Sequence, residues 1–256
     1  MLIPKNDRGE FRGIGLLESI HKIVSQIINL RMAKSITFSE EVHGFRAKRG
    51  TNTAIGETKV RMQMVSMSSE TTYQIYLDLR KAYDSIDRGR VLQIMKKYKV
   101  GKNLRRYMKN VWNSQYFILR QGGFYSDPLE VNRGCTQGDT DSPIIFNLII
   151  DAVLRTWRKE DWRGSRACFY ADDGLIEHGD HRKLQTDIDK MINLFERVGL
   201  KTNEIKTKCM VLRGPPAPKP LSREVYDRAR RRRKRIGGEK KIGTNARSVG
   251  FVERRC

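Results

Sequence analysis

The sequence predicts an α+β fold, in which strands and helices share one domain. β-rich runs such as TTYQIYLDL (71–79) and CFYADDGLIEHGD (168–180) are separated by runs whose apolar residues recur at helical spacing. The 256 residues are 38% hydrophobic and 31% charged, so the chain has enough apolar side chains to bury a core.

The first third of the chain is expected to be mainly helical. Residues 16–34 predict an amphipathic helix that packs one face inward. Its apolar side chains are Leu16, Ile20, Ile23, Val24, Ile27, Ile28 and Met32. A loop rich in Gly, Arg and Thr, HGFRAKRGTNTAI, leads into a second helix near 53–68. The β-rich run 71–79 then ends at a charged turn.

Residues 91–100 and 104–112 predict two short helices, and 115–131 predicts a hairpin with Gly122 and Gly123 as its turn. RGCTQGDTDSP (133–143) is a polar loop that ends with Ser142 and Pro143 at the start of an apolar helix, 144–157. The hairpin 168–180, an amphipathic helix 181–198 and a last strand, KCMVLRG (208–214), complete the order.

The net charge of +22 comes from 51 Lys and Arg against 29 Asp and Glu. This predicts a polyanionic partner, with nucleic acid as the first candidate and an anionic membrane surface as the second. Residues 213–256 hold 15 Lys and Arg against 4 Asp and Glu, a net of +11. The segment 214–256 is therefore expected to be a basic linker and a tail that is poorly ordered or ordered by a partner. Its run Arg228–Arg235 suits RNA phosphates or a nuclear localisation signal.

An intracellular, non-membrane protein is expected. The cysteines are widely separated and form neither a CxxC motif nor a disulfide pattern. They are Cys135, Cys168, Cys209 and Cys256. The longest apolar run, PIIFNLIIDAVL, is interrupted by Asn147 and Asp151 and is too short to span a bilayer. The opening MLIPKNDRGEFRG lacks the apolar core of a secretory signal.

Carboxylates stand where two β-rich runs end. Asp78 ends one run, and Asp172 and Asp173 end another. If the two strands are neighbours in one sheet, three carboxylates meet at its edge and raise their own pKa values unless cations are present. Such oxygen ligands suit two Mg²⁺ or Mn²⁺ ions, which stabilise phosphoryl transfer when they lie about 3.5–4 Å apart. The alternative is that Asp and Gly stand here only because they suit turns.

Several blocks of the sequence resemble, in order and approximate spacing, the blocks of reverse transcriptases, especially those of non-LTR retroelements and group II introns. The blocks are LIPKNDRGEFRGIGLLESIHKIVSQIINLRM, HGFRAKRG, YLDLRKAYDSID, RGCTQGDTDSPIIFN, FYADDGLI and VGLKTNEIKTK. The resemblance covers roughly residues 1–213. It implies a right-hand polymerase fold, with partial fingers in 1–70 and a palm in 71–213. The palm would be a split βαβ-like antiparallel sheet with helices.

The resemblance also implies roles for single residues. Asp78, Asp172 and Asp173 would hold the two metal ions, with Asp172 as the closer ligand because neighbouring strand residues point to opposite faces. Tyr83 would pack under the incoming sugar and exclude a 2′-hydroxyl. Its alternative role is that of a core tyrosine. Lys206 would lie near the leaving pyrophosphate as a proton donor, or be a surface lysine.

The remaining implied contacts are to the nucleotide and the template. Gln137 and Gly138 would lie against both, and Lys5 and Arg12 would grip the triphosphate. Template phosphates would meet the glycine-flanked loop that carries Arg46, Lys48 and Arg49. For these basic residues, solvated surface charge is the alternative.

The chain departs from the family pattern before the apolar helix. Thr140 and Asp141 stand where reverse transcriptases usually have Pro and an apolar residue. The extra carboxylate would either weaken the binding of a polyanion or act favourably at the helix N-terminus. Gly13 after Arg12 likewise replaces the usual Pro.

The implied function is RNA-directed DNA polymerisation, in which the 3′-hydroxyl of a primer attacks a deoxynucleoside triphosphate on an RNA template. Two alternatives stay open. One is a non-catalytic, maturase-like RNA-binding protein, and the other is a truncated, inactive remnant of a retroelement, since no helical thumb is recognisable.

Overall fold

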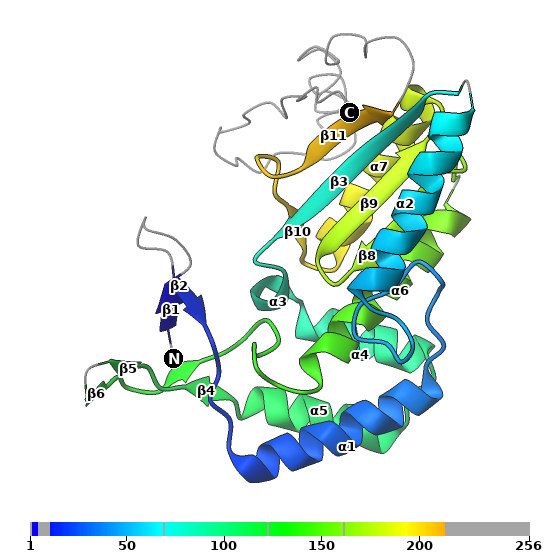
Figure 1. The fold of residues 1–256 in the computed structure, drawn as a ribbon. Helices are drawn as coiled ribbons and strands as arrows, with labels where there is room; N and C mark the ends of the chain where they lie inside the picture. The colour runs from blue at the N-terminus through cyan, green and yellow to red at the C-terminus, as the bar shows by residue number, and fades with distance from the viewer. Residues whose placement is uncertain (1, 5–10, 69, 122, 161, 213–256) are drawn as a thin grey trace, which may run out of the picture.

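The computed structural model describes residues 2–4, 11–68, 70–121, 123–160 and 162–212 (Figure 1). Its centre is a five-stranded sheet. Four strands follow the order β10-β3-β9-β8, and the fifth, β11, also pairs with β3. All of these pairings are antiparallel. The strands are β3 (Thr72–Arg80), β8 (Arg166–Tyr170), β9 (Asp173–His178), β10 (Lys201–Thr202) and β11 (Lys208–Leu212).

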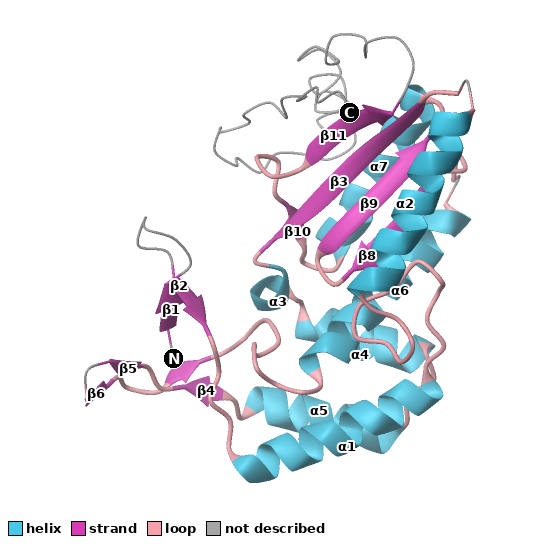
Figure 2. Ribbon diagram, in the orientation of Figure 1, coloured by secondary structure: helices cyan, strands magenta, loops and turns pink. Residues whose placement is uncertain are grey.

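Helices cover both faces of this sheet. α6 (Ser142–Lys159) and α7 (His181–Arg197) lie on one face, and α2 (Thr51–Met67) crosses the other (Figures 1 and 2). The remaining helices lie below the sheet in Figure 2. They are α1 (Ser19–Ser35), α3 (Ala82–Ser85), α4 (Arg88–Lys97) and α5 (Lys102–Asn113). The result is a layered α+β domain, as predicted.

Three short ribbons project from this body. They pair β1 (Leu2–Pro4) with β2 (Phe11–Gly13), β4 (Tyr116–Phe117) with β7 (Leu129–Glu130), and β5 (Arg120–Gln121) with β6 (Phe124–Tyr125). The last two form the hairpin predicted at 115–131. β1, β2 and β10 were not predicted, because two or three residues are too few to show a period.

The helix predicted at 16–34 exists as α1, but most of its apolar face does not pack inward. Ile28 and Met32 are buried against the core. Leu16, Ile20, Ile23 and Ile27 are exposed, which corrects the prediction for those four side chains. α1 is apolar on two adjoining stripes, and its contact with α6 covers only one of them. The sequence pattern does not distinguish the two.

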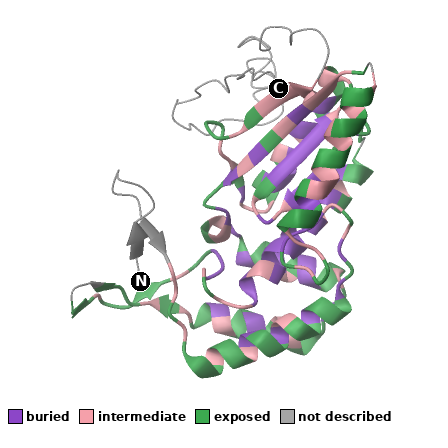
Figure 3. Cartoon of the chain, in the orientation of Figure 1, coloured by how far each residue is buried: buried purple, intermediate pink, exposed green. Residues whose placement is uncertain are grey.

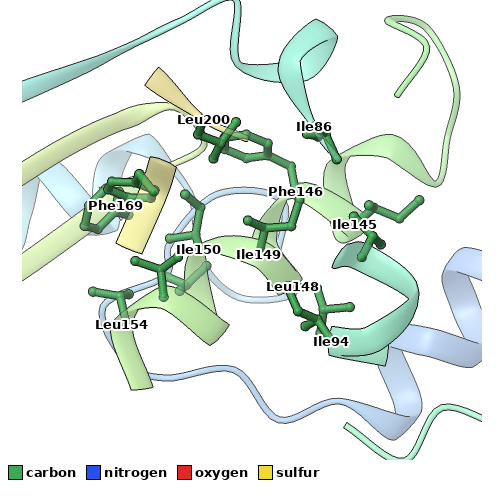
Figure 4. Close-up of a cluster of buried hydrophobic side chains, with 14 of the residues drawn as sticks. Ile86, Ile94, Ile145, Phe146, Leu148, Ile149, Ile150, Leu154, Phe169 and Leu200 are labelled. Atoms are coloured by element: carbon green, nitrogen blue, oxygen red, sulfur yellow. The ribbon is translucent and has the colours of Figure 1, made fainter. Parts of the chain in front are cut away.

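The core is built around α6. Its residues from Ile144 to Ile150 are all buried (Figure 3). Phe146, Ile149 and Ile150 meet Phe169 of β8 and Leu200 in one apolar cluster (Figure 4). Each such side chain contributes roughly 1.5–3 kcal/mol by leaving water. No helix in the described ranges is long and apolar enough to cross a membrane.

Asp151 explains the polar interruption of the α6 sequence. Its side chain is fully buried and accepts hydrogen bonds from the Ser39 backbone N–H (2.7 Å), the Tyr98 hydroxyl (2.5 Å) and Arg155 Nε (2.7 Å). The Ser39 hydroxyl is a further donor. One carboxylate therefore ties α6 to α4 and to the segment that follows α1.

We expect Asp151→Ala to lower the free energy of unfolding by about 3–5 kcal/mol, because it leaves three donors on Ser39 and Tyr98 without their acceptor, at roughly 1–3 kcal/mol each. Tyr98→Phe, which removes one donor, should cost about 1 kcal/mol. Urea unfolding of both variants measures the difference. Equal losses would contradict the view that Asp151 joins several elements.

Candidate active site

The ends of β3 and β9 bring two of the predicted carboxylates together. Asp78 lies directly opposite Asp173 in the antiparallel register. Directly opposed residues point to the same face of a sheet, with Cβ atoms about 5 Å apart. Leu77 and Leu79 are buried on the other face, which fixes the side on which the Asp78 side chain emerges. The expectation that these two segments share a sheet edge is confirmed.

Asp172 lies in the turn between β8 and β9. Because Tyr170 pairs with Asp173, this turn has only two residues, Ala171 and Asp172. Ala171 has a φ of 53°, a left-handed conformation that two-residue hairpin turns often require. Neighbouring residues point to opposite faces only within a strand, and Asp172 lies in a turn. That Asp172 is the closer metal ligand therefore stays a prediction.

The predicted loop 43–50 braces this turn. His43 N donates to Phe169 O at 2.8 Å, and a Cβ at Gly44 would lie 2.8 Å from Ala171 N. Gly174 lies in β9 and not in the turn. A Cβ at Gly174 would collide with the Phe169 ring. The glycine beside the aspartates is therefore explained by packing, not by turn dihedrals.

The three carboxylates interact electrostatically. Partial burial and then the charges of Asp172 and Asp78 raise the pKa of Asp173 above its ordinary value. The nearby Lys206 ammonium opposes this rise in pKa. The repulsion predicted from the sequence is present, and a cation among the carboxylates would relieve it.

The backbone of Asp78 is held by the segment between β10 and β11. Asn203 N donates to Asp78 O at 2.8 Å, and Asp78 N donates to Thr207 Oγ1 at 3.3 Å. This segment carries Lys206, whose side chain is exposed. The chain thus delivers the predicted lysine to the same sheet edge as the carboxylates.

The carboxylates suit a divalent ion that is shared with a substrate. Among the described residues, no group of three His, Cys, Asp or Glu side chains is gathered so as to hold a metal ion by itself. Mg²⁺ commonly binds through one or two carboxylates together with substrate phosphates and water, rather than in an all-protein cage. Asp78, Asp172 and Asp173 offer the oxygen donors that such a shared site needs.

Tyr83 lies beside this cluster on the short helix α3. Its ring stacks on Phe146 with centroids 4.9 Å apart and is partly buried. Burial, followed by the charge of Asp172, raises the pKa of Tyr83. Tyr83 therefore packs on the core with one side and lies near the aspartates, so the two roles considered for it do not exclude each other.

The loop 133–138 is fitted closely against α3 and the N-terminal segment. Cys135 N donates to Tyr83 O at 2.9 Å, and a Cβ at Gly134 (φ +81°) would lie 2.8 Å from the same oxygen. Gly15 N donates to Gln137 O at 2.8 Å. Gly138 has a φ of +104°, and a Cβ there would lie 2.9 Å from Gly15 O. In the described structure, Gly138 thus permits close approach of the protein's own backbone.

Asp141 stands at the N-terminus of α6 but does not cap it, because its carboxylate accepts no capping hydrogen bond. It is 6% exposed, and burial together with the charge of Asp139 raises its pKa to about 7. Asp139 itself lies 2.7 Å from His21 Nε2. Asp141 therefore does not stabilise the start of α6 by a capping hydrogen bond. It is a buried carboxyl group that is readily protonated.

The three basic residues of loop 43–50 that are predicted to contact nucleic acid differ in their partners within the protein. Arg46 donates to the carbonyls of Ser39 and Val42, each at 2.7 Å. Arg49 donates to Glu40 O at 2.7 Å and pairs with the Glu40 carboxylate. Lys48 is exposed. Arg46 and Arg49 thus have intrachain roles, and template contact by this loop stays a prediction.

The predicted triphosphate residues lie at the edge of the described structure. Arg12 belongs to β2, where it pairs with Ile3. Lys5 and the whole basic tail 214–256 lie outside the described residues.

Arg88 organises the site and was missed by the sequence analysis. It is buried, and it donates to Gly134 O and Trp112 O, each at 2.9 Å, and to Val131 O and Gln115 Oε1. Burial lowers the pKa of its guanidinium. It holds the loop 131–136 against α4 and α5. Nothing in the sequence separates it from the other Lys and Arg residues of 88–126.

Comparison with known proteins agrees with this geometry. Residues 3–245 match the family model described as "Reverse transcriptase (RNA-dependent DNA polymerase)". The Pol polyprotein of the retrotransposable element R2DM of Drosophila melanogaster is 28% identical over 82% of this chain and 20% of its own length. A putative COX1/OXI3 intron 1 protein of Saccharomyces cerevisiae is 24% identical over 83% of this chain and 24% of its own length.

A solved structure of Candida tropicalis telomerase, in complex with a fragment of telomeric RNA, has the same fold. It superposes with a TM-score of 0.65 and 15% identity over 86% of this chain and 41% of the telomerase chain. The fold and the paired aspartates define a polymerase palm of the reverse transcriptase type. The chain belongs to the reverse transcriptase (RNA-dependent DNA polymerase) family. It spans about a fifth to a quarter of the curated relatives named above.

We expect Asp141→Asn to make the protein more stable than wild type at high pH only. The native pKa of Asp141, about 7, lies above its ordinary 3.8, so the native state holds the proton more tightly than the unfolded chain. Wild-type stability should therefore fall as pH rises from about 4 through about 7. The gain of Asp141→Asn should be small at pH 4 and reach about 4 kcal/mol at pH 8. Urea unfolding across this range measures it. The exposed Asp127→Asn serves as the control, and a gain independent of pH would contradict the assignment.

Proposed function

We propose that this chain is the polymerase domain of a retroelement reverse transcriptase that extends a primer with deoxynucleotides on an RNA template. The observation that carries the proposal is the register of β3 and β9, which sets Asp78 opposite Asp173 with Asp172 in the adjoining turn. A chain of the reverse transcriptase family needs acidic groups at this sheet edge for phosphoryl transfer.

In this proposal Asp78, Asp172 and Asp173 hold two divalent ions, Mg²⁺ or Mn²⁺. When bound, such ions neutralise charge on the attacking and leaving oxygens of the phosphoryl group. The protein fixes the position of the Asp78 carboxylate, because the Asp78 backbone is held on both sides. It is hydrogen-bonded to the 203–207 segment on one side and paired with β9 on the other. Lys206, at this edge, donates a proton toward the leaving pyrophosphate.

The nucleotide would lie between the carboxylates and the loop that contacts α3. Tyr83 excludes the 2′-hydroxyl with its ring, which Phe146 supports from behind. Gln137 and Gly138 face the base pair, and Lys5 and Arg12 grip the triphosphate. The basic tail supplies further RNA phosphate contacts or a nuclear localisation signal.

We expect Asp78→Asn and Asp172→Asn each to reduce primer extension on an RNA template by roughly a thousandfold, since loss of metal-ion stabilisation costs several kcal/mol. Extension with labelled primer in Mg²⁺ or Mn²⁺ measures this. Asp127→Asn, on an exposed ribbon, is the matched control and should extend as wild type does.

Extension that survives both substitutions would contradict the metal-site assignment. A folded wild-type protein that binds the primer–template but does not extend it would favour the non-catalytic binder. A folded wild type that neither binds nor extends would favour the inactive remnant.

We expect Tyr83→Ala to raise incorporation of ribonucleotides relative to deoxynucleotides by roughly tenfold, because the ring that meets the 2′-hydroxyl is removed. Single-nucleotide extension with each substrate measures the ratio. Tyr83→Phe keeps the ring and should discriminate as wild type does. If Tyr83→Ala still rejects ribonucleotides equally well, the steric role is wrong.

A further inference from the structure

The two helices α4 and α5 lie in a long segment without acidic residues. Between Asp87 and Asp127 the chain holds ten Lys and Arg residues and no Asp or Glu. Two of the ten, Arg88 and Arg105, donate to backbone carbonyls within the fold. Arg90 donates to Gln93 Oε1, and Arg120 lies over the Tyr125 ring. The remaining six gather on α4, α5 and the turn between them.

These six side chains form what we call the α4–α5 basic face. On α5, Lys102, Arg106 and Lys109 stand at positions i, i+4 and i+7, which lie on one side of a helix. Met108 and Trp112, which lie on an adjoining side of α5, are buried. Lys96 and Lys97 end α4, and Lys99 lies in the connecting turn. The full set, Lys96, Lys97, Lys99, Lys102, Arg106 and Lys109, is exposed.

The charge of this face is not compensated by the protein. Within the described part of the chain, none of the six side chains forms an ion pair, whereas Arg61 and Arg155 elsewhere each pair with a carboxylate. Lys102 is also the first residue of α5, whose first turn carries no acidic side chain. A cation there opposes the helix dipole. Lys96 and Lys97, by contrast, stand in the last turn of α4, where the helix dipole favours cations. The cost at Lys102 and the repulsion among the α5 cations would be offset by a bound anion.

The face lies apart from the candidate active site. Figure 1 shows α5 at the bottom of the molecule beside α1, whereas the ends of β3 and β9 lie above α3. A ligand of the basic face and a substrate at the aspartates can thus be held by different parts of the surface.

We propose that the α4–α5 basic face binds the phosphodiester backbone of double-stranded nucleic acid, with duplex segments of the template RNA as its source. With a rise of about 1.5 Å per residue, Lys102 and Lys109 lie roughly 10 Å apart along α5. One duplex strand carries three or four phosphates over that length. Tyr107 is an exposed aromatic residue of α5, but it stands away from the i, i+4 and i+7 positions of the basic face. Binding of single strands usually depends on stacking against aromatic rings. The choice of RNA as the duplex rests on the proposed function, whereas the proposed contact with a phosphodiester backbone does not.

The test compares two triple variants with equal loss of charge. The first is Lys102→Gln, Arg106→Gln and Lys109→Gln on α5. The control is Lys159→Gln, Arg182→Gln and Lys183→Gln, at exposed positions of α6 and α7. Binding of a blunt 20-base-pair RNA duplex is measured by fluorescence anisotropy between 0.05 and 0.2 M salt. A blunt duplex offers no template to copy, so the result stands even if the protein fails to extend primers.

We expect the α5 variant to lower the slope of log affinity against log salt by about 2.7, which is about 0.9 for each lost phosphate contact. Its affinity deficit relative to wild type should then be roughly 40-fold larger at 0.05 M than at 0.2 M salt. The control variant should keep the wild-type slope. A thermal unfolding midpoint no lower than that of wild type confirms that the α5 variant is folded.

Equal effects of the two variants, or no effect of either, would overturn the proposal, since net charge rather than this face would then set the affinity. A DNA duplex of the same sequence forms the second arm. Similar losses on both duplexes support backbone contact, and a loss confined to DNA would overturn the assignment to RNA.

Discussion

The register between β3 and β9 is the constraint on which the site depends. A slip of one residue would turn the Asp78 side chain toward the core and bring Leu77 and Leu79 out to solvent. Burial of those leucines against the layer of α6 and α7 therefore sets the position of a carboxylate that takes no part in the core. Because β3 is paired on both sides, the edge tolerates carboxylates that repel one another.

The rest of the site is positioned by close backbone contacts rather than by further apolar packing. Gly134 and Gly138 each occupy positive φ at points where a Cβ would collide with neighbouring backbone. Arg88 joins the same loop to α4 and α5 through carbonyl oxygens. Several segments that are far apart in sequence thus meet around Tyr83. Loss of one such contact would displace a whole loop, since few apolar side chains anchor it.

The meeting of the aspartate-bearing strands followed from the resemblance to reverse transcriptases, because the two strands are far apart in the chain. Long periodic segments could be predicted from the sequence itself, because each depends on a local pattern. α6, α7 and the β8–β9 hairpin are such cases. The exposed stripe of α1 could not be predicted, because two apolar stripes compete and only tertiary packing chooses between them. Asp151 and Arg88 could not be predicted either. A buried polar residue and a surface one have the same letter in the sequence, and only the surrounding donors and acceptors tell them apart.

The distribution of charge links the carboxylates to the rest of the molecule. At a net charge of +22, the protein attracts a polyanion over long distances, and the α4–α5 basic face strengthens this field on one side. At the ends of β3 and β9 the three carboxylates give the local field the opposite sign. After partial burial, the charges of Asp172 and Asp78 are the next causes of the raised pKa of Asp173. A phosphate attracted to the protein would be repelled there. Under the proposed function, a phosphate can therefore reach the aspartates only together with cations, so binding of metal and binding of nucleotide should favour each other.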